Sequence, residues 1–225
     1  MKTKELFDLS HTLASPLLAG TVYPWECLSE IGAFVLAFGK SLDPSLYDER
    51  DGDVWIAKSA TVYPTATIIG PCIIGENTEV RPGAFIRGKV LVGNDCVVGN
   101  STELKNCILF DNVDVPHYNY VGDSVLGYKA HLGAGAVTSN IKSDKTDVVI
   151  RFDGGEIETK LRKCGAMVGD HVEIGCNSVL CPGTVIGRGT TVYPLSRVRG
   201  CVKENSIFKA PDNIVTKNAS RPERP

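Results

Sequence analysis

The sequence repeats with a period of six residues. From Ile56 to Leu104 each sixth residue is aliphatic, nine times in succession, and the same spacing returns from Val168 to Val198. A period of six fits neither the three-and-four spacing of a helix face nor the strict alternation of a half-buried strand. It predicts a solenoid of short strands, in which each repeat stacks on its neighbours.

Two further features of the repeat indicate how a coil is built. Small or slim residues such as Ala60, Cys72 and Thr102 stand four positions after the aliphatic ones, where they would fill tight interior corners. Glycine often follows the aliphatic residue, as at Gly75, and permits the backbone angles of a sharp corner. If three hexads close one coil, residues eighteen apart stack about 4.8 Å from each other.

The repeat divides the chain into one solenoid with attachments. Hexads fill residues 53–209, whereas residues 1–52 lack them and place apolar residues at helical spacing after Pro24. We therefore expect residues 1–52 to form a short N-terminal helical cap on the solenoid.

Two other segments leave the repeat. Residues 141–164 contain Asp153-Gly154-Gly155 between two strand-like stretches, which predicts an inserted β-hairpin arm. Insertions of this kind tend to build the binding face of a solenoid. Residues 210–225 are expected to form a mobile tail.

Composition excludes several classes of function. The net charge is −2 with both signs interspersed, which argues against a nucleic-acid partner. The eight cysteines include no C-x-x-C pair, so we interpret them as reduced packing residues of a cytoplasmic protein. Charged residues interrupt the first twenty positions, which disfavours a signal peptide, and the apolar stretch from Ile31 to Phe38 is too short to cross a membrane.

Three polar residues stand out from the repeat itself. Arg87 and Lys105 are eighteen apart and should stack on one face, where a bound anion would relieve their repulsion; the alternative is that Glu103 and solvent neutralise them. His117 lies in the stretch 109–137, where the period slips to five between Val121 and Leu126. A histidine suits proton removal at neutral pH, although an isolated one is more often packed or solvent-facing. Irregularity in a strict repeat favours a site.

Four motifs carry a family resemblance. In order and spacing they resemble the acetyltransferase domain of bifunctional N-acetylglucosamine-1-phosphate uridyltransferase/glucosamine-1-phosphate acetyltransferase: R-P-G-A (81–84), G-N-S-T-E-L-K-N (99–106), H-Y-N-Y-V-G-D (117–123) and L-G-A-G-A-V-T-S-N (132–140). The arm and R-K-C-G-A-M-V-G-D (162–170) look more like the C-terminal domain of archaeal-type sugar-1-phosphate nucleotidylyltransferases. The resemblance implies an all-β fold, a left-handed parallel β-helix, against the usual right-handed crossover.

The same resemblance implies acetyl-CoA-dependent N-acetylation of a hexosamine 1-phosphate, with glucosamine or galactosamine 1-phosphate as the small-molecule substrate. His117 would be the general base, Glu103 would orient its imidazole or hold the ammonium, and Asn140 would lie at the acetyl group. The sugar phosphate would be bound by four residues: Arg81, Lys105, Tyr120 and His131. CoA would be bound by another four: Ala134, Cys176, Arg162 and Lys163.

The chain departs from the bacterial pattern at three positions. His131 replaces a sugar-binding asparagine, Ile141 a tyrosine and Cys176 a CoA-contacting serine. The nucleotidyltransferase half of such enzymes is not expected here, because 52 residues cannot hold it. Relatives of this kind imply a homotrimer with sites in the grooves between solenoids, and no membrane or nucleic-acid partner.

Two other functions stay open at this point. One is a non-catalytic or regulatory solenoid related to sugar nucleotidyltransferases. The other is a zinc hydratase similar to γ-class carbonic anhydrases, with His117, His131 and His171 as ligands, although the close histidine pair of that family is missing. The preferred hypothesis requires no metal.

Overall fold

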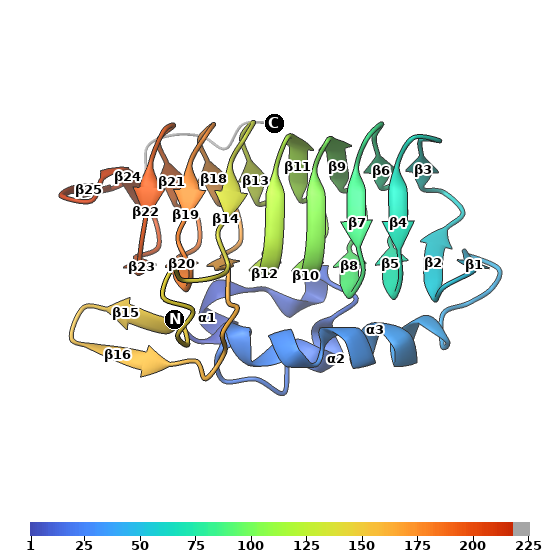
Figure 1. The fold of residues 1–225 in the computed structure, drawn as a ribbon, viewed down its shortest axis with the longest axis horizontal. Helices are drawn as coiled ribbons and strands as arrows, with labels where there is room; N and C mark the ends of the chain where they lie inside the picture. Colours follow the sequence, from blue (N-terminus) through green and yellow to red (C-terminus); the bar gives the residue numbers. More distant parts are fainter. Residues whose placement is uncertain (218–225) are drawn as a thin grey trace.

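The computed structural model describes residues 1–217 and confirms a left-handed β-solenoid of parallel strands with a helical N-terminal segment and an inserted hairpin (Figure 1). Each coil has three sides. We call them the front face, the back face and the helix-covered face.

Successive strands stack in parallel on each face. The front face contains β4 (Thr67–Ile69), β7 (Phe85–Arg87), the first halves of β10 (Glu103–Leu109) and β12 (Tyr120–Leu126), β14 (Val137–Thr138), β19 (Val179–Leu180) and β22 (Arg197–Val198). The back face contains β3 (Thr61–Val62), β6 (Glu79–Val80), β9 (Val97–Asn100), β11 (Asp114–His117), β13 (His131–Leu132), β18 (Glu173–Ile174), β21 (Thr191–Val192) and β24 (Ser206–Ala210). The helix-covered face contains β2 (Val54–Ala57), β5 (Cys72–Ile74), β8 (Val90–Val92), the second halves of β10 and β12, β17 (Ala166–Val168), β20 (Thr184–Ile186) and β23 (Cys201–Val202).

The repeating aliphatic residues form the core. Ile86, Leu104 and Val121 stack in register on consecutive coils and are fully buried, which is the main favourable contribution to folding. The slim residues at the corners also have a polar role: Thr78 and Thr102 donate their hydroxyls to backbone carbonyls of the coil at 2.7 and 2.9 Å. The hexad thus supplies both the apolar filling and the partners for corner carbonyls that the strands leave free.

The N-terminal helices lie along a side of the solenoid. They are α1 (Thr3–Leu6), η1 (Leu9–His11), α2 (Ser15–Leu18), η2 (Pro24–Ser29) and α3 (Ile31–Gly39), and they run beneath the coils in Figure 1. The end of α3 packs on the first coil, where Gly39 lies flat against Trp55, but α3 also reaches β5, β8 and β10. The N-terminal helices therefore cover one face over several coils. The first coil is closed instead by β1 (Tyr47–Arg50), which pairs antiparallel with β2.

The first residues form a strap across three corners of the solenoid. The amide of Asp170 donates to the Leu6 carbonyl at 3.1 Å, and the amide of Asp8 donates to the Asp170 carboxylate at 2.7 Å. Further along, the Asp111 amide donates to the carbonyl of His11 at 3.0 Å. Since the Tyr128 amide also donates to Asp170, at 2.9 Å, the strap (residues 6–11) is bonded across successive coils.

Two consecutive coils contain seventeen residues instead of eighteen. Phe85 pairs with Glu103, eighteen positions on, whereas Glu103 pairs with Tyr120, seventeen positions on. The residue is lost between Glu103 and Cys107, because Cys107 already pairs with Val90 at a separation of seventeen. The shortening therefore lies at the corner between the front and helix-covered faces.

Asn106 and Asp123 occupy the two shortened corners, with φ of 48° and 47°. Asn and Asp tolerate this left-handed region better than other side chains do, so the residue types fit the tightened turn. The step of five between Val121 and Leu126 in the sequence is the corner at Asp123. Both corner side chains turn out to belong to the polar cluster described below.

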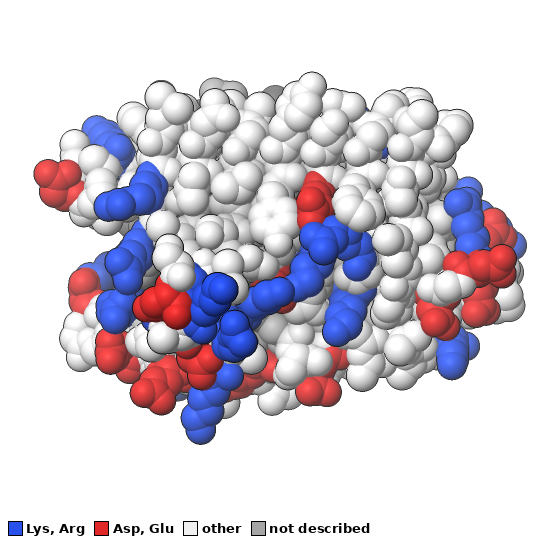
Figure 2. Space-filling view, in the orientation of Figure 1, with Lys and Arg blue, Asp and Glu red and all other residues white. Residues whose placement is uncertain are grey.

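The arm forms as expected. β15 (Val149–Phe152) pairs antiparallel with β16 (Gly155–Glu158), with the turn at residues 153–154. Val148 and Ile150 are buried, and both pack against Gly183 on a corner of the solenoid. Charged side chains gather over the arm, at the two ends and near the middle of the front face, while the upper part of that face is largely uncharged (Figure 2).

The C-terminal segment differs in part from the expected mobile tail. β25 (Asn213–Thr216) folds back and pairs antiparallel with β24, so the hairpin extends the back face. Residues 218–225 lie outside the described residues. Within residues 1–217, no helix reaches the length and apolar character that crossing a membrane requires.

Candidate active site

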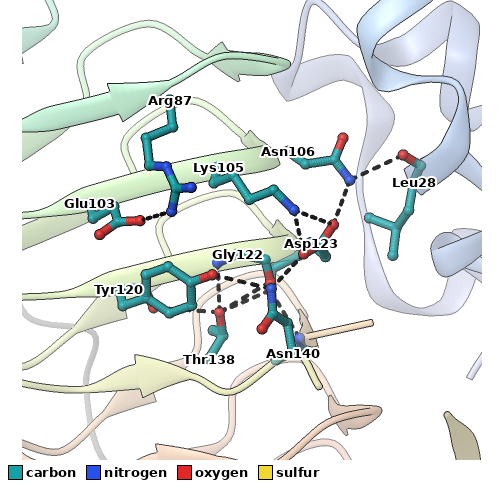
Figure 3. Close-up of polar contacts among 12 residues, drawn as sticks. Leu28, Arg87, Glu103, Lys105, Asn106, Tyr120, Gly122, Asp123, Thr138 and Asn140 are labelled. Carbon is teal, nitrogen blue, oxygen red and sulfur yellow. Dashed lines mark hydrogen bonds and ion pairs between the residues drawn. The ribbon is translucent and has the colours of Figure 1, made fainter. Parts of the chain in front are cut away.

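Three residues expected from the motifs meet in one cluster on the front face (Figure 3). Lys105, Tyr120 and Asn140 come from three consecutive coils. The Asn140 carboxamide donates to the Tyr120 hydroxyl at 3.1 Å and to Asp123 at 2.5 Å. Lys105 Nζ lies 3.1 Å from the same Asp123 carboxylate. All three residues are partly buried, and these hydrogen bonds fix the relative positions of their side chains.

Asp123 is the centre of this cluster, and the sequence motifs did not single it out. Its side chain is nearly buried and accepts from Lys105, Asn140 and, at 2.8 Å, Asn106. Asn106 also donates to the carbonyl of Leu28 at 3.2 Å, which connects the cluster to η2. The signal that could have identified Asp123 is the period slip, because the shortened corner lies at Asp123 itself.

Glu103 and Arg87 form a separate ion pair beside the cluster. Arg87 Nη1 lies 2.6 Å from Glu103 Oε1, and each cation of the Arg87–Lys105 stack therefore has its own carboxylate. The sequence alternative in which Glu103 neutralises part of this face agrees with that arrangement. Burial raises the pKa of Tyr120, and nearby Asp123 and Glu103 raise it further, so its hydroxyl stays protonated at neutral pH.

His117 lies exposed at the corner between the back and front faces. Within the described residues its imidazole makes no hydrogen bond, and Glu103 bonds Arg87 instead; the expected orientation of the imidazole by Glu103 is thus not seen in a single copy. Ala134 and Cys176 lie at the same corner on the following coils, joined by the Asn177 amide donating to the Ala134 carbonyl at 2.8 Å. The corner therefore brings His117, Ala134 and Cys176 into one row.

Arg81 and His131 lie on the back face. Arg81 pairs with Glu79 at 2.8 Å, and His131 Nδ1 lies 2.8 Å from Glu173 Oε2. The hydrogen bond to Glu173 raises the pKa of His131 above its usual 6.5. These two residues point away from Lys105, because outward side chains on adjacent faces of a prism diverge.

Arg162 and Lys163 lie at the neck of the arm and are exposed. Lys163 forms an isolated bridge with Ile141, and the Cys164 amide donates to the Asn140 carbonyl at 2.9 Å. The neck is therefore closed directly beside the front-face cluster.

The described residues 1–217 contain no group of three or more His, Cys, Asp or Glu side chains placed to hold a metal ion. The three histidines of the zinc alternative are dispersed: His117 is at one corner, His131 is on the back face, and His171 packs edge-on against Tyr128 with ring centroids 5.4 Å apart.

Comparison with known families supports the sequence resemblance. Residues 68–151 match the GMPPB C-terminal domain, and residues 165–200 match the bacterial transferase hexapeptide family of six repeats. The bifunctional protein GlmU of Methanococcus maripaludis strain C5 is 29% identical over 198 residues, covering 87% of this chain and 48% of the relative. A bifunctional sugar-1-phosphate nucleotidylyltransferase/acetyltransferase of Sulfurisphaera tokodaii is 32% identical over 177 residues, covering 71% and 44%.

The chain spans about half the length of these relatives. Among solved structures, the acetyltransferase domain of PglB from Neisseria gonorrhoeae in complex with acetyl coenzyme A aligns with a TM-score of 0.37 and 17% identity, covering 73% of this chain and 58% of that domain. A similarity at that level transfers no activity or binding residue.

Proposed function

Because the chain is a hexapeptide-repeat β-solenoid homologous to the GlmU-type bifunctional proteins, we propose that it transfers the acetyl group of acetyl-CoA to the amine of a hexosamine 1-phosphate. The observation that carries the proposal is the front-face cluster. Lys105, Tyr120 and Asn140 come from separate motifs, but in the fold Asp123 accepts from Lys105 and Asn140, and Asn140 also donates to Tyr120.

In the proposed reaction His117 removes a proton from the substrate amine. The freed nitrogen lone pair attacks the thioester carbonyl, and collapse of the tetrahedral intermediate breaks the carbon–sulfur bond and releases CoA as a thiol. Asn140 keeps one carboxamide N–H on Asp123 and exchanges the other from the Tyr120 hydroxyl to the developing oxyanion. Because Asp123 accepts from Asn140, it acts as a positioning residue for that amide.

In this proposal the cationic side chains bind the phosphate of the sugar. A guanidinium fork at Arg81 and the ammonium of Lys105 complement phosphate oxygens, and Tyr120 and His131 donate to sugar hydroxyls. Ala134 and Cys176 line the corner on which the pantetheine chain would lie, with Arg162 and Lys163 near it at the neck of the arm.

One copy of the chain does not bring all these groups to one place. Lys105 and Tyr120 point outward from the front face, whereas Arg81 and His131 point outward from the back face. We propose that the front face of one copy meets the back face of the next in a homotrimer, with His117 at the shared corner. The neighbouring copy would then also supply the carboxylate that orients the imidazole.

Thiol release from acetyl-CoA tests the proposal, measured with glucosamine 1-phosphate and with galactosamine 1-phosphate. His117→Ala should lower turnover by about two to four orders of magnitude, as expected for loss of a general base. His11→Asn is the matched control, because His11 stacks on Tyr128 in the strap and has no role in the reaction. Thiol release that is absent from the wild type, or unchanged in His117→Ala, contradicts the proposal.

A non-catalytic solenoid remains the second candidate, and one observation favours it. Lys105 and Asn140 are both already engaged by Asp123, and the described part of the chain gives His117 no orienting partner. This candidate predicts no acetyl-CoA turnover with any amino-sugar phosphate, together with unchanged behaviour of His117→Ala in every binding assay.

A further inference from the structure

A cavity of about 450 Å³ lies between the arm and the last coils of the front face. Lys142 and Arg151 line it from the arm, and Arg197 and Arg199 from the solenoid. In Figure 2 the left part of the molecule is indented between the coils above and the arm below, with Lys and Arg side chains bordering the indentation. A volume of this size is typical of small-molecule sites.

The charges around the cavity are unbalanced. Its lining contains four cations and a single carboxylate, Asp144, although the chain as a whole carries a net charge of −2. Lys142 pairs with Asp144 at 3.6 Å, and Arg151 pairs with Glu156 at 3.3 Å outside the lining, so the excess charge lies at the two arginines of the solenoid. In the part of the chain that the structure describes, Arg197 and Arg199 make no ion pair and no side-chain hydrogen bond. Like charges held together in this way are stabilised by a bound anion.

The floor of the cavity is a long column of two small residues and one arginine. β14, β19 and β22 pair in register, so the residues that follow them, Ser139, Cys181 and Arg199, stack outward in one column. At the usual strand spacing this column extends over roughly 10 Å, which is longer than a single phosphate. Ser139 and Cys181 leave the space open, and Arg199 closes the far end with a guanidinium fork.

The arm holds the remaining wall in place. Gly200 has φ of 79° and lies so close to the Arg151 carbonyl that a side chain there would collide with it. Lys142 Nζ donates to the Asp147 carbonyl at 3.2 Å, which fixes its position within the arm. The cations therefore come from segments that are packed together, and the wall is built before any ligand arrives.

We propose that this cavity, which we call the arm pocket, binds the diphosphate of a nucleotide-like ligand. Planar guanidinium groups suit bidentate contact with phosphate oxygens, and the length of the floor accommodates two phosphates in line. The diphosphate could belong to the CoA of the acetyl donor, in which case the inference rests on the proposed function, or to a free nucleoside diphosphate. The pocket begins at Ser139, next to Asn140, so a donor bound there would extend toward the front-face cluster.

Calorimetric titration of the full chain with ADP and, separately, with CoA tests the arm pocket. The variant is R197Q/R199Q. Because both arginines are exposed, the substitutions should preserve the fold, and the midpoint of urea unfolding checks this. The matched control is K40Q/R50Q, which removes the same charge from the residue that follows α3 and from β1, at the other end of the solenoid. We expect the variant to raise the Kd by roughly tenfold or more, from lost charge-assisted hydrogen bonds, and the control to leave it unchanged.

The two ligands distinguish the two possible sources of the diphosphate. Weakening of CoA alone identifies the acetyl donor, whereas weakening of ADP with CoA binding intact identifies a free nucleotide. If neither ligand binds the wild type, or if R197Q/R199Q binds both as the control does, the arm pocket is refuted. Arginine-dependent binding of ADP in a protein that releases no thiol from acetyl-CoA would remove the proposed function and retain the pocket.

Discussion

Replacement of Asp123 by Asn tests whether the buried carboxylate holds the front-face cluster together. Asn tolerates the left-handed backbone at this corner, so the substitution changes the charge and not the turn. The carboxylate accepts from Lys105 Nζ at 3.1 Å, Asn106 Nδ2 at 2.8 Å and Asn140 Nδ2 at 2.5 Å. An amide offers one acceptor oxygen, and its NH₂ group would face at least one of these donors.

The expected loss follows from those contacts. Each hydrogen bond to a charged group contributes about 1.5–3 kcal/mol, so losing one or two gives roughly 1.5–6 kcal/mol. Lys105 is 25% exposed and can recover some hydration, which lowers the expected loss to about 3 kcal/mol. The assay is urea unfolding followed by circular dichroism at one fixed protein concentration, because association would shift the midpoint.

The control for Asp123→Asn is Asp153→Asn at the tip of the arm. That carboxylate is 87% exposed and pairs with Lys203 at 3.0 Å, so its loss should change the free energy of unfolding by less than about 0.5 kcal/mol. A double-mutant cycle with Lys105→Met should give a coupling energy of about 1–3 kcal/mol. Equal effects of the two Asp→Asn changes, or no coupling with Lys105, would refute the assigned role of Asp123.

Three further outcomes can be checked with the same protein. Gly39→Ala should destabilise the fold by about 1–3 kcal/mol, because its Cβ would overlap Trp55 and push α3 away; an unchanged urea midpoint would contradict that packing. The His131–Glu173 bond raises the folded-state pKa of His131, so its contribution is full below pH 6.5 and is lost as the pH rises through the folded value. Since both groups are partly exposed, the free energy of unfolding of the wild type should fall by less than about 1 kcal/mol relative to that of His131→Gln between pH 6 and 8. If the free energies of unfolding of the two proteins had the same pH dependence, the His131–Glu173 bond would be excluded. Burial raises the pKa of Cys27 to about 12, so a thiol reagent should label it only after urea is added, and rapid labelling of the native protein would show that it is not buried.

The six-residue repeat predicted most of the fold. Its period predicted the solenoid, and Asp153-Gly154-Gly155 predicted the hairpin, because both depend on local backbone geometry that the residue types determine. The direction in which the N-terminal helices run was not predictable in this way. It depends on contacts such as Gly39 with Trp55, between segments that no periodicity relates.

The candidate site was predictable only in part. Motifs pointed to Lys105 and Asn140, and the slip in the period pointed to the right stretch of chain. The importance of Asp123 depends on its contacts with both neighbouring coils, to Lys105 and Asn106 on one side and Asn140 on the other, which a slip in the period does not specify. The arm cations that line the same cavity as Arg197 depend on where the arm folds back, and a stack of hexads carries no information about that position.

The N-terminal strap has a consequence for how the molecule unfolds. In a stack where each layer touches only the next, one end can loosen while the other stays intact. The strap bonds to Asp111 and Asp170 on opposite sides of the Tyr128 layer, so these layers cannot separate without first releasing residues 6–11. The middle of the stack, which includes the layer of Asn140, is thereby held as a single cooperative block.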